Sequence, residues 1–149
     1  MRILRVIYVL GIAVALVLLV FAGVQAFYPE PSYPEYDPPI WDYDSPEYQE
    51  WEQEWMEMQQ EYWQEIAVHD RNVFLFVLPL GVVFAIVGTF LQRRLDIFGT
   101  GLILGGIGTM IFAVVPYELE NIPRFIGIAV ILAVLVFVGY KVFLPLKRS

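Results

Sequence analysis

The chain has no cysteine among its 149 residues. Disulfide bonds, thiolate catalysis and cysteine-bound zinc or iron–sulfur centres are therefore excluded. Lysine and arginine are also missing between Tyr28 and Asp70, a segment that carries 13 acidic residues. Because nucleic acid and anionic lipid attract basic surfaces, a segment with this charge is unsuited to either. We expect no nucleic-acid partner.

Charged residues are missing from the middle of four long apolar blocks, and 58% of the whole chain is hydrophobic. The blocks are Val6–Phe27, Val73–Leu91, Ile97–Val115 and Phe125–Phe143. Each has about the 17–25 residues that a helix needs to cross a bilayer. We therefore predict an all-α membrane protein with four transmembrane helices. Residues 1–27 form the first helix, residues 28–71 form an acidic ectodomain, and residues 72–149 hold the other three helices.

Catalytic constellations are missing as well. Near the middle of the blocks the polar residues are Thr89, Thr100 and Thr109. Proton relays, coupled transporters and voltage sensors normally place ionisable groups there. The sequence also lacks a Ser–His–Asp set, paired buried carboxylates and a metal-binding cluster. We expect no enzyme activity, no cofactor, no metal site and no catalytic residue.

The basic residues are unevenly distributed about the four blocks. Most of them would share one side of the membrane: Arg2, Arg5, Arg93, Arg94, Lys141, Lys147 and Arg148. Arg71 and Arg124 would lie on the other side. Cytoplasmic loops of membrane proteins are rich in lysine and arginine. The pattern predicts a multi-pass protein of the cell (plasma) membrane with both termini cytoplasmic and with residues 28–71 and 116–124 extracytoplasmic.

The first block also has features of a secretory signal peptide. It follows the basic start of the chain and ends near small residues at Val24–Ala26. Its apolar run from Val6 to Phe27 is longer than the roughly 7–15 residues of a signal peptide. We therefore expect the block to be retained as a membrane anchor.

Proline is concentrated in residues 28–44, where it alternates with tyrosine and acidic residues. The prolines there are Pro29, Pro31, Pro34, Pro38 and Pro39. Proline has no backbone N–H and favours polyproline II over helix. Composition alone is also typical of a disordered linker.

A helix is predicted directly after the proline-rich segment. Ser45 is a suitable N-cap, Pro46 suits the first helical position, and Glu47 suits the positive end of the helix dipole. Aromatic and apolar residues then recur every three or four positions, at Tyr48, Trp51, Trp55, Met58 and Tyr62. This spacing places them in one stripe of an amphipathic helix. No proline or glycine intervenes before Pro79, so the helix should continue into the second apolar block.

The aromatic stripe needs a cover, and three covers are compatible with the sequence: the membrane interface, another chain, and the proline-rich segment. The helix lacks the basic residues of most helices that lie on a membrane. As polyproline II, residues 29–41 would span about 40 Å. As a helix, residues 46–70 would span about 37 Å, with Asp42–Ser45 as the turn between the two arms. We therefore favour a hairpin, and otherwise the stripe is the candidate binding surface for a protein partner.

Glutamates recur beside the aromatic stripe, at Glu47, Glu50, Glu54, Glu57 and Glu61. Carboxylates suit Ca²⁺ and Mg²⁺, but the spacing is unlike that of an EF-hand, and a straight helix cannot wrap an ion. We interpret the line as a solvated acidic face. The lone His69 is expected where the helix meets the lipid headgroups, without metal-binding partners.

Glycine is frequent in the third block, which contains GTGLILGGIG at Gly99–Gly108. The spacing differs from that of a phosphate-binding loop. Gly101 and Gly105 form a G-x-x-x-G step, which allows membrane helices to pack closely. Gly81 and Ala85 belong to a matching small-residue face on the second block.

The stretch from DRNVFLFVLPLG through the glycine-rich block to RFIGIAVILAVLVFVGYKVF resembles uncharacterised small multi-pass membrane proteins of prokaryotes. The resemblance implies a membrane location and brings no catalytic residues. We expect an accessory or scaffold protein in the lipid bilayer that presents its acidic, aromatic ectodomain to a protein partner or forms a homo-oligomer. The alternative is a homo-oligomeric pore that conducts cations through an acidic vestibule.

Overall fold

The structure, a computed structural model, describes residues 1–38, 43–116 and 118–144. Within these residues the regular secondary structure is entirely helical. The helices are α1 (Arg2–Phe27), α2 (Pro46–Leu91), α3 (Asp96–Val114) and α4 (Asn121–Phe143). The prediction of an all-α chain is confirmed.

All four helices are long and apolar enough to cross a membrane. α1 has 26 residues, α3 has 19 and α4 has 23, and a helix needs about 20 residues to cross the hydrocarbon core. α2 has 46 residues, so only part of it is needed for a span. These lengths and compositions support a multi-pass membrane protein.

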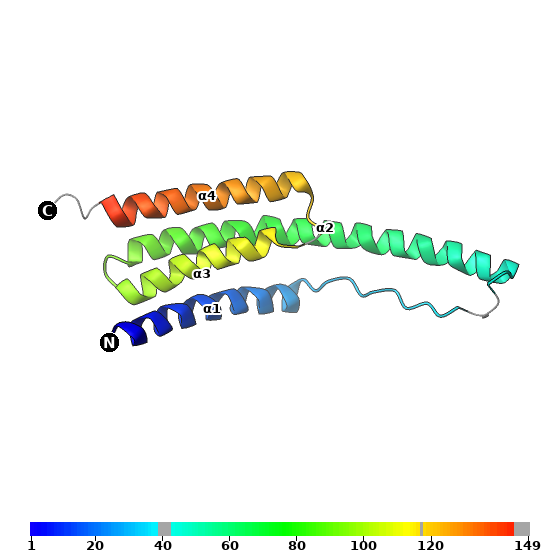
Figure 1. Ribbon diagram of the computed structural model, residues 1–149, viewed down its shortest axis with the longest axis horizontal. Coiled ribbons are helices and arrows are strands. Elements are labelled where there is room, and N and C mark those ends of the chain that lie inside the picture. Colours follow the sequence, from blue (N-terminus) through cyan, green and yellow to red (C-terminus); the bar gives the residue numbers. More distant parts are fainter. Residues whose placement is uncertain (39–42, 117, 145–149) are drawn as a thin grey trace.

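The helices form a bundle with α3 at its centre (Figure 1). α3 packs against both α1 and α2, and α4 packs against α2 and α3 on the side away from α1. Ala85, Met110 and Ala113 are fully buried where α2 meets α3. In the most apolar 18-residue stretch of each helix, 50% of the residues of α3 are buried, but only 17% of those of α1 and of α4. The outer faces of α1 and α4 are therefore left for lipid.

α2 extends far beyond the ends of the other helices (Figure 1). Ser45 caps its N-terminus, because the serine hydroxyl accepts a hydrogen bond from the Tyr48 backbone N–H at 3.2 Å. Pro46 follows at the start of the helix, where the missing N–H has no cost. Pro79 lies within α2 and removes one hydrogen bond, yet the helix continues through it to Leu91.

Residues 29–38 run outward from the end of α1, alongside the projecting half of α2 (Figure 1). Residues 29–38 are non-helical, and residues 43–45 form a turn that leads into α2. Pro39, Trp41 and the first residue of the predicted turn, Asp42, lie outside the described residues. We call residues 28–38 together with residues 43–68 the stalk.

The end of the bundle opposite the stalk holds the start of α1, the end of α4 and the turn between α2 and α3 (Figure 1). Arg5 of α1 forms an ion pair there with Asp96 at the start of α3. Gln92 Nε2 donates a hydrogen bond to Thr100 Oγ1 at 3.3 Å across the α2–α3 turn. These polar contacts close the bundle at the end that carries most of its basic residues.

Candidate functional site at the stalk and its base

Tyrosines of the proline-rich segment lie against the aromatic stripe of α2. The ring of Tyr36 stacks on Trp51, with centroids 5.9 Å apart and planes 5° apart. Trp51 stacks in turn on Trp55, at 6.1 Å and 6°. Tyr33 meets Trp55 edge-on at 6.1 Å and Tyr62 edge-on at 5.1 Å. Stacked and edge-on pairs at such distances attract one another beyond the burial of their area, so the ladder ties the segment to α2.

Hydrogen bonds join the same two segments. The Tyr36 hydroxyl donates to Glu54 Oε2 at 2.7 Å, and Gln59 Nε2 donates to the Tyr33 hydroxyl at 3.1 Å. The hydrogen bond to Glu54 raises the pKa of Tyr36, and desolvation and the negative charge of Glu54 act in the same direction. A phenolate beside a carboxylate is unfavourable. Tyr36 therefore stays a neutral donor to a more alkaline pH than a free tyrosine does.

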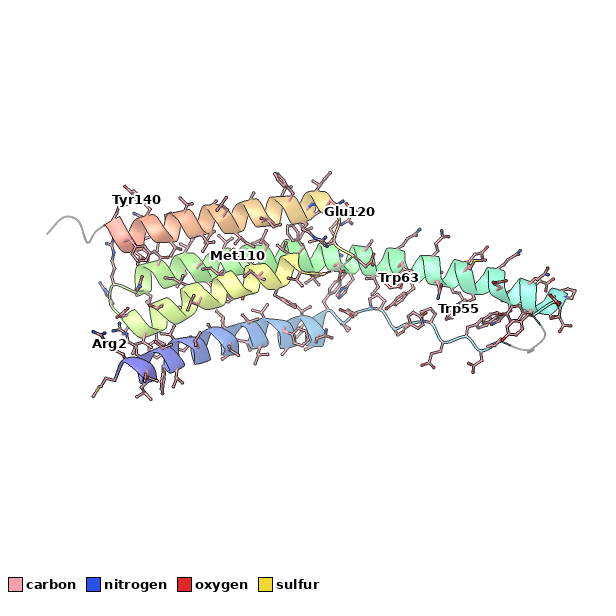
Figure 2. The ribbon with its side chains drawn as sticks, in the orientation of Figure 1. Arg2, Trp55, Trp63, Met110, Glu120 and Tyr140 are labelled. Atoms are coloured by element: carbon pink, nitrogen blue, oxygen red, sulfur yellow. The ribbon has the colours of Figure 1, made fainter. Side chains whose placement is uncertain are left out.

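The five residues of the predicted stripe are partly covered. The side chains of all five are half-buried: Tyr48, Trp51, Trp55, Met58 and Tyr62. The Trp51 indole nitrogen is buried, and no described residue accepts a hydrogen bond from it. Trp63 lies off the stripe and is 48% exposed (Figure 2). Whether the stripe residues bind a partner stays a prediction.

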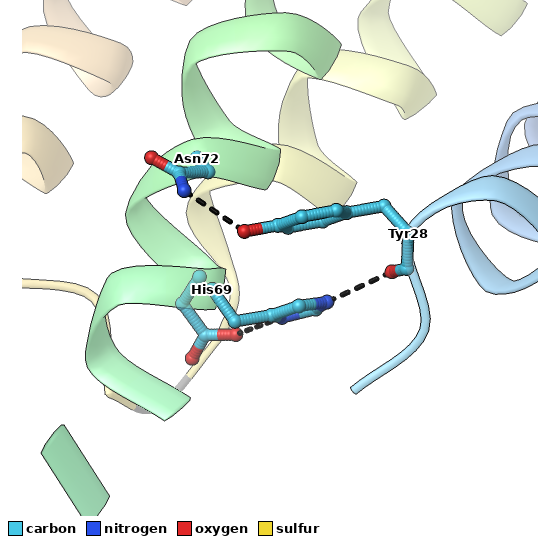
Figure 3. A network of polar contacts seen from close by, with 4 residues as sticks. Tyr28, His69 and Asn72 are labelled. Carbon is cyan, nitrogen blue, oxygen red and sulfur yellow. Dashed lines mark hydrogen bonds and ion pairs between the residues drawn. The ribbon is translucent and has the colours of Figure 1, made fainter. Parts of the chain in front are cut away.

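At the base of the stalk, the first residue after α1 is held against α2 (Figure 3). The ring of Tyr28 stacks on the imidazole of His69, with centroids 4.8 Å apart and planes 2° apart. His69 Nε2 lies 3.0 Å from the Tyr28 carbonyl oxygen. Asn72 Nδ2 donates to the Tyr28 hydroxyl at 2.8 Å. Three contacts from one residue therefore set the direction in which the chain leaves α1.

His69 and its neighbour Asp70 are both buried, with 6% and 8% of their surface exposed. His69 Nδ1 lies 3.5 Å from Asp70 Oδ1. A carbonyl oxygen only accepts hydrogen bonds, so Nε2 must carry the hydrogen that it shares with Tyr28. A neutral imidazole has one N–H, and Nδ1 then has none to donate to Asp70. His69 is therefore a donor to Asp70 only when its ring is positively charged.

A cavity of about 700 Å³ lies beside this contact, between the base of the stalk and the ends of α1 and α3. Its aromatic lining residues are Phe21, Tyr62, Trp63 and Phe112. Its acidic lining residues are Glu30, Asp70 and Glu118. Among the described residues, no lysine or arginine lines it. The cavity therefore combines an aromatic wall with negative charge.

Glycine allows α2 and α3 to approach closely within the bundle. Gly106 of α3 lies against Gly81 and Ala85 of α2. A β-carbon added at Gly106 would lie 2.6 Å from the Gly81 carbonyl oxygen and 2.6 Å from the Ala85 backbone nitrogen. Because backbone atoms cannot move aside as a side chain can, this contact requires glycine.

The G-x-x-x-G step of α3 lies against α1. A β-carbon added at Gly101 would lie 2.7 Å from Ile12 Cγ2, and one added at Gly105 would lie 2.6 Å from Leu16 Cδ2. Gly101 and Gly105 thus contact α1, whereas the small-residue face of α2 contacts a different glycine of the same helix. α3 uses two glycine faces for two neighbours.

The acidic line on α2 lies on the surface. Exposed side chains include those of Glu47, Glu50, Glu54, Glu57 and Glu61. In the part of the chain that the structure describes, no three histidine or acidic side chains group together in a way that could hold a metal ion.

Sequence reasoning missed two features of the stalk. Tyr33 and Tyr36 are three residues apart, which is one turn of polyproline II and places both on one side. That spacing was a usable signal for their shared contact with α2. Glu30 and Glu118 are far apart in the sequence, and no local pattern indicated that both line one cavity with Asp70.

Comparisons with known protein families, with curated proteins and with solved structures found no match to this chain.

Proposed function

We propose that this protein is an accessory or scaffold protein of a prokaryotic cell membrane that presents its stalk to a protein partner. The continuity of α2 carries the proposal, because the single helix Pro46–Leu91 belongs both to the bundle and to the stalk. A helix that is packed into the bundle along one half holds its other half in a defined direction. The aromatic ladder adds a second segment of chain alongside, which makes the stalk a stiff projection.

The proposed partner has a basic surface, because the surface of the stalk is acidic. From Tyr28 to Val68 the sequence contains no lysine or arginine. Exposed carboxylates attract basic surfaces across about 8–10 Å and raise the rate of association. Tyr33 and Tyr36 occupy the aromatic stripe, so the acidic faces beside it are the proposed contact surface. Trp63 adds exposed aromatic area to them.

In the proposed orientation both termini lie in the cytoplasm, and residues 28–71 and 116–124 lie on the extracytoplasmic side. The clustering of basic residues at the end of the bundle opposite the stalk supports it, since lysine and arginine favour the cytoplasmic side. The residues concerned are Arg2, Arg5, Arg93, Arg94 and Lys141. The acidic segment that ends at Asp70 belongs to the opposite end.

Two matched charge variants test the proposed contact surface. Changing Glu50, Glu57 and Glu61 to Gln removes three exposed charges and leaves the Tyr36–Glu54 hydrogen bond in place. Changing the same three residues to Asp keeps the charges. We expect proteins that co-purify with the wild type in mild detergent, identified by mass spectrometry, to be retained by the Asp variant and lost from the Gln variant. Equal recovery with both variants would rule out an acidic contact surface.

The cation-conducting pore stays an alternative prediction. A pore would need polar groups that face a shared channel. Thr89 and Thr109 are instead buried, and their hydroxyls donate to Ala85 O and Gly105 O of their own helices at 2.8 Å. Reconstitution into liposomes separates the two functions, because the scaffold gives no cation conductance and the pore does.

A further inference from the structure

We propose that the cavity at the base of the stalk binds an organic cation with an apolar tail, namely an ammonium group attached to a hydrocarbon chain. At about 700 Å³ the cavity has the size of a small-molecule site, since such sites usually measure ~300–1,000 Å³. The cavity uses other carboxylates than Glu50, Glu57 and Glu61, the three that test the proposed protein contact.

The charge of the cavity comes from three separate parts of the chain. Glu30 follows α1, Asp70 belongs to α2, and Glu118 lies between α3 and α4. Arg124, the basic residue nearest in sequence to Glu118, is not among the lining residues, and its Nη2 donates to the Pro116 carbonyl oxygen at 2.8 Å. The charge that complements this lining is positive.

Asp70 points most directly to a ligand. Its carboxylate is buried, and a buried carboxylate is costly unless a donor or a cation is paired with it. Its contact with His69 Nδ1, at 3.5 Å, is a hydrogen bond only when the His69 ring is positively charged, because Nε2 carries the hydrogen shared with the Tyr28 carbonyl oxygen. A cationic group in the cavity would pair with this carboxylate directly.

The lining selects an organic cation over a metal ion. Glu30, Asp70 and Glu118 are not grouped closely enough to hold a metal ion together. The cavity has an apolar wall in which Phe21 of α1 meets Phe112 of α3 edge-on, with centroids 5.7 Å apart. Aromatic faces attract ammonium groups through their π electrons, and the wall takes up a hydrocarbon tail.

A series of three probes with the same apolar part isolates the charge: phenylbutylammonium, phenylbutanol and phenylbutyrate. Binding is measured by isothermal titration calorimetry with the full chain in a nonionic detergent. We expect the ammonium compound to bind at least about tenfold more tightly than the alcohol, because only the cation pairs with Asp70. The carboxylate should bind most weakly of the three. Equal affinity for the ammonium compound and the alcohol would overturn the proposal.

Variants assign the effect to the cavity. Asp70→Asn should weaken binding of phenylbutylammonium about tenfold and leave the affinity for phenylbutanol unchanged. Glu50→Gln, which removes an exposed charge of α2 away from the cavity, should bind the ammonium compound as the wild type does. The double variant Glu30→Gln and Glu118→Gln provides the same test if Asp70→Asn does not fold. Wild-type affinity in the cavity variant that folds would refute the site.

The cation can reach the cavity from water or from the bilayer, and vesicles distinguish the two routes. Phosphatidylcholine vesicles are prepared with stearylamine or with stearyl alcohol. A higher unfolding temperature with stearylamine in the wild type, but not in Asp70→Asn, indicates a cation that enters from the bilayer. An equal rise in both proteins is a general effect of surface charge and counts against the site.

Discussion

Tyr28 and His69 stack ring on ring at 4.8 Å, although they are 41 positions apart in the chain. Tyr28 is the first residue after α1, and His69 belongs to α2 (Figure 3). The contact therefore ties the start of the proline-rich segment to α2 at the base of the stalk.

Two variants of Tyr28 separate the ring contact from the hydrogen bond. Tyr28→Ala removes the stack on His69 and the hydrogen bond from Asn72, whereas Tyr28→Phe removes the hydrogen bond alone. We expect Tyr28→Ala to lower the free energy of unfolding by about 1–2 kcal/mol and Tyr28→Phe to lower it by less. Chemical unfolding in detergent measures both. Equal losses in the two variants would show that the stack contributes nothing.

The tyrosine ladder should control the environment of the stalk tryptophans. Changing Tyr33 and Tyr36 together to Ala removes the rings that cover Trp51 and Trp55. We expect a red shift of tryptophan fluorescence and faster proteolysis within residues 28–38. Tyr140→Ala is the control, because Tyr140 is 59% exposed and lies at the far end of the bundle (Figure 2). An unchanged spectrum in the double variant would argue against the ladder.

Alkaline pH should loosen the stalk through Tyr36. The pKa of Tyr36 is raised by its hydrogen bond to Glu54, so the stabilisation is present in full below the ordinary pKa of tyrosine. It is lost as the pH rises through the raised pKa. The phenolate absorbance of the wild type minus that of Tyr36→Phe reports this one titration. Glu54→Gln should return the pKa of Tyr36 toward the ordinary value of tyrosine. If the wild type and Glu54→Gln titrate alike, the hydrogen bond between Tyr36 and Glu54 is contradicted.

Glycine-to-alanine changes in the bundle should lower its stability by amounts that depend on which atoms the new β-carbon contacts. Gly106→Ala meets backbone atoms of α2, and we expect a loss of about 1–3 kcal/mol in stability. Gly105→Ala meets the movable end of Leu16 and should cost less. Gly11→Ala is the control, because nothing lies within 4 Å of the added carbon. Thermal unfolding in detergent ranks the three, and a Gly106→Ala protein as stable as Gly11→Ala would contradict the close contact of α2 and α3.

The orientation can be tested with single cysteines, since the chain has none of its own. Ser45 caps α2 and is unsuited to replacement, whereas Ser32 lies exposed in the proline-rich segment. We expect Ser32→Cys to react with an impermeant maleimide in whole cells and Ser149→Cys to react only after lysis. The reverse pattern would invert the proposed topology.

Local chemistry was enough to predict the four helices and the start of α2. Whether a helix can cross a membrane depends on the length of an apolar run, and every residue of the run is adjacent in the sequence. The cap at Ser45 likewise involves residues three positions apart. The tyrosines that cover the aromatic stripe could be predicted in part from the sequence. Tyr33 and Tyr36 are one turn of polyproline II apart, so they lie on the same side of the segment.

Only the tertiary structure decided which surfaces meet. Glycine-rich α3 has small residues on several faces. Because α3 packs against two neighbours at once, its rotation about its own axis is fixed. In that rotation Gly101 and Gly105 face α1, and Gly106 faces α2. The cavity at the base of the stalk depends on segments that are distant in the sequence. Its charge arises because the end of α1, the middle of α2 and the end of α3 converge at one level, and no local pattern encodes that convergence.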